Sequence, residues 1–532
     1  MNRAVVLTVL GLASPAAAGG LFLPGSGAIS TSRAGAAVAS TEGGEALGLN
    51  PAGISKSEGT TITVSAAIID YAMSFQRRGT YDDIPDIDLP YEGTPYPLVR
   101  DDAKPPLALG GYQPIPVIAI TSDLGKVVPG LTVAAGLYAP NSYPFRRMCT
   151  EQPGGGCRPY TFNGDPNEAP SPARYDIVEQ DALLLMPTIA ASYRITDKLD
   201  VGARFGVGRA HIDSKIHVWG KPGNLVEDVG GDGLFHIEGE DNFVPGFGVG
   251  AAFRPTANIE LAAVYNSKLT LGAKGWAHAE LGPRTGATGI DVMVAPLPDE
   301  AARCGTGGTA ERQRGCVTIE IPQTAAIGGR YKFLDGAGKL RGDVELQVGW
   351  ENWGAERASD FLVVIDSEIV TSLGGGVGLK DNIVAHGFRD VWNARLGGSW
   401  LFPVGESAVI ARGGVGYDTA AAKPGWMRAD LDGAARTTLT VGAGYRGQRF
   451  QIDAGFGVSL EGTTTNPGTC NPISDQMRGC AGDGVEDPIE DREGPDPINP
   501  IVNPDQQAQG PVNQGVFKSH YVMFMLGAST WF

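Results

Sequence analysis

The sequence predicts an all-β fold, a transmembrane antiparallel β-barrel of about 14 strands. Three observations support this prediction: an N-terminus typical of exported proteins, no later apolar run long enough for a spanning helix, and repeated alternation of apolar and polar residues. The 77 glycines and 37 prolines among 532 residues disfavour a helical protein, because both residues interrupt helices. They suit strands joined by turns.

The pattern of residues 1–18 predicts a signal peptide. Arg3 supplies a positive charge, Ala4–Ala13 form a short apolar run, and the small residues up to Ala18 suit a cleavage site. A membrane anchor would need roughly 20 apolar residues, and this run is shorter. We therefore expect cleavage after Ala18, export, and a mature chain in the bacterial outer membrane.

The segment 340–350 illustrates the alternation. One face carries Leu340, Val344, Leu346, Val348 and Trp350, and the other carries Arg341, Asp343, Glu345 and Gln347. Four polar groups cannot face lipid, so we expect them to face a lumen. In 258–271 the apolar set expected on one face is Ile259, Leu261, Ala263, Tyr265, Leu269 and Leu271. A soluble β-sandwich also alternates, but its strands are typically about 5 to 6 residues long.

The alternating segments are joined by short turns and long connections in sequence. The expected strands are 60–75, 107–120, 130–141, 182–195, 199–214, 243–254, 258–273, 317–332, 340–351, 389–402, 407–417, 436–446, 448–460 and 519–532. Long loops on one side and short turns on the other are typical of outer-membrane barrels. The last segment ends on Phe532, which looks like the assembly signal of outer-membrane proteins and predicts contact with the barrel-assembly machinery and with membrane lipid.

The six cysteines form three close pairs in expected loops: Cys149 with Cys157, Cys304 with Cys316, and Cys470 with Cys480. Six cysteines allow many connectivities, and local pairing is favoured because strands separate the three loops. An oxidising compartment agrees with disulfides. Such cysteine pairs could instead bind zinc. However, no C-x-x-C occurs and the six histidines show no HExxH spacing, so we expect no metal and no cofactor.

The remaining composition excludes several other functions. A net charge of -17 disfavours nucleic-acid partners, which need basic patches. No GxSxG elbow or motif-placed catalytic triad is present, so we expect no enzyme. The acidic stretch 483–496 lacks EF-hand spacing and is expected to be a solvated loop rather than a calcium site.

Residues 19–57 precede the first strand and show no strand pattern. The segment Gly25–Ser55, above all Asn50-Pro51-Ala52, resembles the N-terminal hatch of the FadL/TodX family of outer-membrane transport proteins. Further similarities in the same order are Leu184–Ile212, Gly246–Thr270, Ile321-Pro322 and Phe388-Arg389-Asp390. The resemblance spans essentially the whole mature chain, 19–57 as a hatch that plugs the lumen and 58–532 as the barrel.

The family resemblance implies three candidate sites. Asn50, Pro51 and Ala52 would fix the hatch, although they could also form an ordinary turn before the first strand. The family has a lateral opening at a kink in the third strand, which here corresponds to Leu137, Tyr138, Ala139, Pro140 and Asn141; Pro140 could instead simply end that strand. The expected capture groove in long loops comprises Val218, Trp219, Leu234, Phe235, Trp276 and Leu281.

The resemblance implies passive transport of hydrophobic compounds, foremost long-chain fatty acids, through a monomeric barrel gated by its hatch. An apolar pocket can take up such molecules through burial alone, at about 25 cal/mol per Å². Two alternatives remain open at this stage: a porin for polar solutes, because Arg341, Asp343 and Glu345 also suit a water-filled channel, and a structural adhesin with long loops.

Overall fold

The computed structural model describes residues 22–532 except 85–86, 106–109, 153–154, 162–166, 219–227, 285–291, 372–373, 375, 380, 424–425 and 467–514. The predicted signal peptide 1–18, Trp219, the pair Cys470 and Cys480, and the acidic stretch 483–496 lie outside the described residues.

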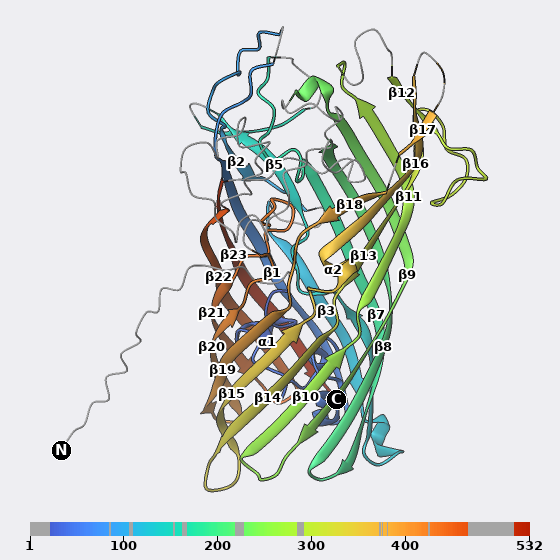
Figure 1. Cartoon of the computed structure of the whole chain (residues 1–532). Coiled ribbons are helices and arrows are strands. Elements are labelled where there is room, and N and C mark those ends of the chain that lie inside the picture. The colour runs from blue at the N-terminus through green and yellow to red at the C-terminus, as the bar shows by residue number, and fades with distance from the viewer. Residues whose placement is uncertain are drawn as a thin grey trace, which may run out of the picture.

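The chain forms a closed antiparallel β-barrel of 14 strands (Figure 1). The wall consists of β1 (Thr60–Arg77), β3 (Gln113–Ser122), β4 (Leu131–Tyr138), β7 (Glu179–Thr196), β8 (Leu199–Val218), β9 (Gly233–Phe253), β10 and β11 (Ile259–Asn266 and Leu269–Leu281), β13 and β14 (Gln313–Ile321 and Thr324–Leu334), β15 (Leu340–Glu351), β19 (Val391–Val404), β20 (Ser407–Asp418), β21 (Arg436–Arg446), β22 (Phe450–Asn466) and β23 (Gly515–Trp531). The predicted fold class is confirmed.

The barrel closes where the first strand meets the last. β1 and β23 pair in one continuous register, from Thr61 opposite Trp531 to Arg77 opposite Gly515. Closure leaves no free edge along the first and last strands, as a sheet in lipid requires, since no water is available there for unpaired backbone groups. Short turns join the strands at one end of the barrel and long connections join them at the other (Figure 1). We call these the turn end and the loop end.

Residues lie on the outer and inner faces of the strands as the alternation predicted, with one correction. Leu346, Val441 and Leu526 are exposed on the outer face. Leu269 and Leu271, expected on the outer face, are buried inside the barrel. The strand is interrupted at Ser267–Lys268, between β10 and β11, so the residues that follow have changed faces.

Several predicted boundaries were wrong at the loop end. β9 begins at Gly233 rather than at 243, and β22 continues to Asn466 rather than ending at 460. These extensions hydrogen-bond to neighbouring strands, β9 to β8 and β22 to β23, so backbone pairing continues where the apolar alternation has ended. The alternation reports contact with lipid, and strands that project past the lipid lose it.

The connections contain short elements of their own. They are β2 (Leu98–Asp101), β5 (Arg146–Glu151), β6 (Cys157–Pro159), β12 (Val292–Pro296), β16 (Asp360–Thr371), β17 (Gly376–Gly378), β18 (Asn382–Ala385), α2 (Glu356–Ser359) and the 3-10 turns η3 (Leu124–Lys126) and η4 (Val229–Gly231). Before the first strand lie α1 (Ala28–Thr31), η1 (Gly43–Leu47) and η2 (Pro51–Lys56). In the described part of the chain, none of the helices has the length and apolar character needed to cross a membrane.

Two predicted disulfides are confirmed, Cys149 with Cys157 and Cys304 with Cys316. The first links β5 to β6 in a loop hairpin. The second anchors the connection before β13, where the backbone N–H groups of Arg303 and Cys304 also donate to Asp366. Both bonds therefore hold loop segments to strands at the loop end.

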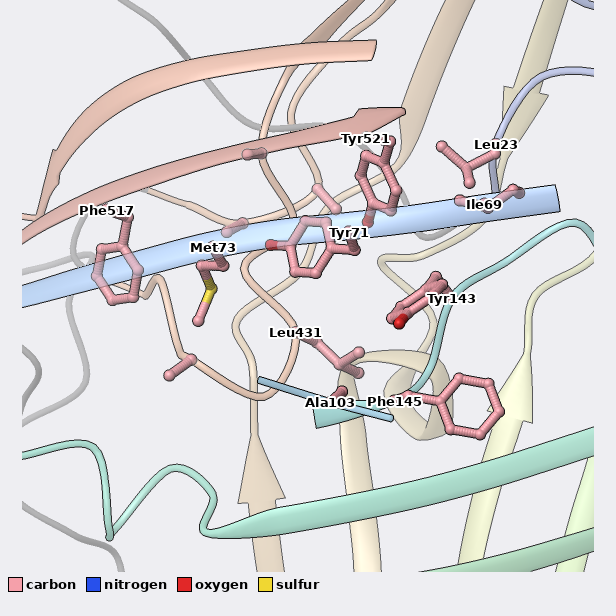
Figure 2. Close-up of a cluster of buried hydrophobic side chains, with 14 of the residues drawn as sticks. Leu23, Ile69, Tyr71, Met73, Ala103, Tyr143, Phe145, Leu431, Phe517 and Tyr521 are labelled. Atoms are coloured by element: carbon pink, nitrogen blue, oxygen red, sulfur yellow. The ribbon is translucent and has the colours of Figure 1, made fainter. Parts of the chain in front are cut away.

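The largest apolar core lies inside the barrel. Figure 2 shows that loop residues pack against the inner faces of β1 and β23. The loop side chains are Ala103, Tyr143, Phe145 and Leu431, and the strand side chains include Ile69, Tyr71, Met73, Phe517 and Tyr521. The connections thus enter the barrel and fill one side of its interior.

Replacing Leu346 by arginine tests the membrane orientation of the wall. Leu346 lies at the middle of β15 on the outer face. We expect the free energy of unfolding in lipid vesicles to fall by ~2–4 kcal/mol, because a charge at the bilayer midplane is costly. Val404→Arg, at the turn end of β19, is the control and should cost only ~0–1 kcal/mol. Equal losses, measured by denaturant titration, would contradict the assignment.

Candidate functional site

The N-terminal segment, residues 22–57, lies inside the barrel and is largely buried (Figure 1). Charged side chains of β15 hold it. Arg33 Nη1 lies 2.8 Å from Asp343 Oδ1, and Glu345 accepts the backbone N–H groups of Ala39 and Ser40 at 2.7 and 2.9 Å. The polar face of β15, expected to line a lumen, thus binds the segment that fills that lumen.

Glycines on the inner face of the wall make room for the segment. A Cβ atom at Gly397 of β19 or Gly414 of β20 would overlap the backbone of Arg33. A Cβ atom at Gly250 of β9 would overlap the side chain of Asn50, and one at Gly202 would overlap Pro51. The segment therefore packs directly against the backbone of the wall.

Asn50, Pro51 and Ala52, the predicted hatch motif, are buried against β8 and β9. The Asn50 side chain accepts the Ala52 N–H at 3.1 Å and donates to the Val38 carbonyl at 2.9 Å. It thereby caps η2 and links two parts of the N-terminal segment. Ser55 Oγ donates to Asp200 Oδ2 of β8 at 2.5 Å, and Lys56 pairs with Glu260 of β10 at 2.8 Å.

The predicted lateral opening lies where β4 ends. β4 stops at Tyr138, paired with Met186 of β7, and Ala139, Pro140 and Asn141 follow outside the strand. Among the described residues, β7 has no strand partner on this side between Met186 and Gln180, which pairs with Arg146 of β5. The wall is therefore interrupted beside Pro140, as expected for a residue without a backbone N–H.

Asn141 connects this interruption to the N-terminal segment. Its side-chain Nδ2 donates to the backbone carbonyls of Leu23, Pro24 and Gly25 at 3.3, 3.1 and 3.0 Å. The backbone carbonyl of Asn141 accepts the Leu23 N–H at 2.6 Å. Residues 23–25 thus cover the interruption from inside. A movement of these residues would change how far the wall is open.

A cavity lies between the N-terminal segment and the wall, and we call it the central cavity. Its empty space is about 1130 Å³, including the part open to solvent. Its lining combines Phe22, Leu23, Gly25 and Leu49 of the N-terminal segment with Tyr138, Ala139, Pro140 and Asn141, and with residues of the strands from β7 to β15 and of β19. The cavity therefore reaches the interruption beside Pro140.

Further irregularities of the wall border the same cavity. The β8–β9 register shifts between Gly208 and Ala210, and the breaks at Ser267–Lys268 and Pro322–Gln323 separate β10 from β11 and β13 from β14. Gly206, Ser267 and Pro322 belong to the cavity lining. Regular hydrogen bonding thus fails on neighbouring strands at one height, which is the height of the cavity.

Arg204 of β8 lines the central cavity and is only 7% exposed. Its guanidinium donates to the Leu47 carbonyl and, at 2.9 Å, to Asn266 Oδ1, and it lies 4.9 Å from the centre of the Tyr138 ring. Within the described part of the chain no carboxylate pairs with it. By contrast, Arg395 in the same lining pairs with Asp418 at 2.8 Å. A buried cation without a counter-ion suits an anionic group entering the cavity.

A second cavity, the loop-end cavity, has about 1020 Å³ of empty space, including the part open to solvent. Thirteen of its eighteen lining residues are apolar, and only Phe235 and Phe361 among them are aromatic. The others are aliphatic side chains such as Ile212, Ile319 and Val363. Such a surface gains free energy from covering an alkyl chain, at about 25 cal/mol per Å².

The polar residues of the loop-end cavity include Asp176 and Asp430, which are held by loop contacts. His386 Nε2 lies 2.9 Å from Asp430 Oδ2, Arg428 lies 3.2 Å from Asp430 Oδ1, and the Ala429 N–H donates to Asp176 at 2.6 Å. Burial opposes ionisation, yet the charges of Arg428 and His386 hold the pKa of Asp430 below its usual range. This network holds residues 428–430 beside the cavity.

Five of the six expected capture residues lie in strands and not in loops, which corrects the prediction, and Trp219 lies outside the described residues. Val218 of β8 and Phe235 of β9 line the loop-end cavity. Leu234 and Trp276 belong to the opposite face of β9 and β11, where Arg312 and Arg314 lie over the Trp276 ring. Leu281 packs beside Gly233. The extra strand length at the loop end brought these positions into the wall.

Two features were not predicted from the sequence. One is the place of Arg204 in the central cavity, and the other is the contact of Asn141 with residues 23–25. Arg204 had a detectable signal, since it is a charged residue on the inner face of the predicted strand 199–214, next to glycines 202, 206 and 208. Its lack of an acidic partner depends on strands distant in sequence and was not visible. Among the described residues, no group of three or more His, Cys, Asp or Glu side chains could hold a metal ion.

Comparison with known proteins agrees with this architecture. Residues 149–468, more than half of the chain, match the family model of the outer membrane protein transport proteins (OMPP1/FadL/TodX). The chain belongs to this family. It is therefore an outer-membrane protein of a family that transports hydrophobic compounds. No curated protein sequence matches the chain.

Solved structures share the fold at low sequence identity. A Pseudomonas aeruginosa FadL homologue superposes with a TM-score of 0.66 at 16% identity, over 96% of this chain and 100% of that one. The Ralstonia pickettii toluene transporter TbuX gives 0.58 at 16% identity, over 96% and 99%. The P. putida toluene transporter TodX gives 0.55 at 15% identity, over 96% and 99%.

Replacing Glu345 by alanine should release the N-terminal segment. The change removes two N–H acceptors and leaves Arg33 with one buried partner fewer, a loss of ~3–5 kcal/mol for such a pair. We expect trypsin to cleave after Arg33, which is protected in the intact protein, while the heat-resistant mobility of the folded barrel persists in gels. Glu240→Ala, which removes an exposed ion pair with Arg209, is the control. Continued protection of Arg33 in the Glu345 variant would contradict the role of this carboxylate.

Proposed function

We propose that the protein carries long-chain fatty acids across the outer membrane by passive diffusion, without catalysis. The fatty acid enters at the loop end, occupies the loop-end cavity and then the central cavity, and leaves as the N-terminal segment rearranges. In this proposal residues 19–57 are the hatch, and the mature chain acts as a monomer. The two cavities and the contacts of the N-terminal segment support this route.

The observation that favours fatty acids over neutral hydrocarbons is Arg204. A fatty acid needs an aliphatic surface for its chain and a cation for its carboxylate. The loop-end cavity supplies the first, and Arg204, buried in the central cavity without a carboxylate partner among the described residues, supplies the second. Charge-assisted hydrogen bonds to a carboxylate are the strong ones in a dry site.

The lateral exit in this proposal is the interruption from Leu137 to Asn141. Pro140 cannot donate a hydrogen bond to β7, and residues 23–25 cover the interruption from inside through Asn141. A ligand that displaces these residues would meet an open wall and membrane lipid. The alternative exit leads to the turn end and the periplasm, and requires displacing the buried contacts of Asn50, Ser55 and Lys56.

Three other functions compare less well with these observations. An aromatic hydrocarbon fits the apolar cavities, and two structural neighbours are named as toluene transporters, but such a ligand leaves Arg204 without use. A polar-solute porin would need an open aqueous lumen, and the buried salt bridges of Arg33 with Asp343 and of Lys56 with Glu260 argue against one. A structural adhesin would need neither cavity.

Deleting residues 19–57 tests the hatch and the class of ligand. We expect the intact protein in mild detergent to bind a fluorescent long-chain fatty acid saturably, with little ion conductance in planar bilayers. The deleted chain should bind it differently and conduct ions, because the lumen loses the segment that fills it. Absence of binding by the intact chain, together with steady conductance, would contradict the proposal and leave a porin.

Arg204→Met tests the carboxylate interaction. We expect the affinity for oleic acid to fall about tenfold or more, because a charged hydrogen bond contributes ~1.5–3 kcal/mol. The affinity for dodecane, which has no carboxylate, should be unchanged, and Arg204→Lys should retain part of the oleic acid binding. Fluorescence competition measures both ligands on the same protein. An equal loss for oleic acid and dodecane would show that Arg204 acts only on the shape of the cavity.

A further inference from the structure

We propose that the side chain of Met186 sets the cross-section of the molecules that pass between the loop-end cavity and the central cavity. This inference rests on the proposed transport of hydrophobic compounds and assigns selectivity within it to one residue. It makes the protein selective for slender alkyl chains over molecules with wide fused rings.

A buried apolar cluster on the inner face of β7, β8, β9 and β11 lies between the residues that line the two cavities, and we call it the partition. It comprises Met186 of β7, Ala210 of β8, Val244 of β9, and Leu269 and Leu271 of β11. All five are at most 9% exposed. Leu184, Ile321 and Tyr138 pack against them. The five partition residues are all apolar.

The order of residues along the strands places the partition between the cavities. On β8, Gly206 lines the central cavity, Ala210 belongs to the partition, and Ile212 lines the loop-end cavity. On β9 the same order runs from Gly246 through Val244 to Ile237. A ligand that moves from one cavity to the other along these strands therefore passes the partition side chains.

Met186 is the partition residue that lies over three glycines of the wall. A Cβ atom at Gly208 would overlap its Sδ, and Cβ atoms at Gly206 and Gly246 would lie 3.4 and 3.5 Å from its Cε. Three glycines on two strands thus provide the surface under the methionine. Leu184, Thr188 and Leu269 also lie against these glycines, so Met186 is one of the side chains that cover them.

The side chain of Met186 can change conformation readily. Methionine is unbranched with three rotatable bonds, whereas valine and leucine are branched and alanine has no rotamers. The pairing of β7 with β8 is also interrupted there. Leu185 lies opposite Arg209 and Thr188 opposite Gly206 in the same register, but Met186 and Pro187 are not among the paired residues, and Pro187 has no N–H to donate. Rotation of Met186 opens a passage about as wide as the thioether chain, which admits an alkyl chain more readily than a fused ring system.

Uptake by cells that produce the full-length chain tests the inference with two probes, oleic acid and 16-(1-pyrenyl)hexadecanoic acid. We expect the intact protein to take up oleic acid faster than the pyrene derivative. Met186→Ala should raise pyrene uptake about three- to tenfold and leave oleic acid within a factor of about two, since small changes in an apolar passage discriminate on this scale. Met525→Ala is the matched control, because Met525 is buried against Gly455 and lines neither cavity.

A second pair of variants separates selectivity from simple loss of packing. Gly208→Ala forces the Met186 thioether off the wall and should lower the uptake of both probes. The double variant Met186→Ala with Gly208→Ala should recover it, because the displaced side chain is gone. Levels of folded barrel are compared by heat-resistant mobility in gels.

The outcomes distinguish the inference from the proposed function. If the intact protein takes up neither probe, the proposed function fails. If it takes up oleic acid but Met186→Ala leaves the ratio of the two probes unchanged, or Met525→Ala changes that ratio equally, only the role of Met186 is overturned. Failure of the double variant to recover uptake would likewise overturn it.

Discussion

Closure of the sheet between β1 and β23 is the constraint on which the rest of the structure depends. In lipid every backbone N–H and C=O of the wall needs a partner, and the seventeen-residue register from Thr61 to Arg77 supplies it for the first and last strands. Once the wall is closed, each strand has one face in lipid and one in the interior. The outer face then has to be apolar, and the inner face is free to carry charges, glycines and cavities.

The interior is filled by segments that lack regular structure, and polar side chains of the wall supply their missing hydrogen bonds. Glu345 and Gln347 accept N–H groups from residues 37–40, and Asn141 binds three carbonyls of residues 23–25. Irregular backbone at membrane depth is stable only with such partners. The N-terminal segment is thus held by side-chain contacts, which are distinct from the backbone pairing that closes the barrel.

Irregular pairing concentrates where the two cavities meet. The end of β4 at Tyr138, the register shift at Gly208, and the breaks before Leu269 and after Ile321 lie around the central cavity, while the strands from β19 to β23 pair without such breaks up to Leu460. The strands from β19 to β23 are therefore the regularly paired side of the wall, and the partition and the interrupted wall lie on the other side. A transporter of apolar molecules needs both, because the route has to deform while the membrane seal persists.

The sequence by itself determined the all-β class, the number of strands and most of their positions: 340–351 and 436–446 coincide with β15 and β21, and two local cysteine pairs were predicted correctly. Lipid imposes a two-residue alternation that any reader of the sequence can see, and loops between strands confine cysteines to near partners. Only the tertiary structure decided which inner residues meet: that Arg204 has no carboxylate beside it, that Asn141 binds residues 23–25, and that Met186 lies over Gly206, Gly208 and Gly246. Inside a closed barrel these neighbours come from distant parts of the chain, and no periodic pattern records their distances.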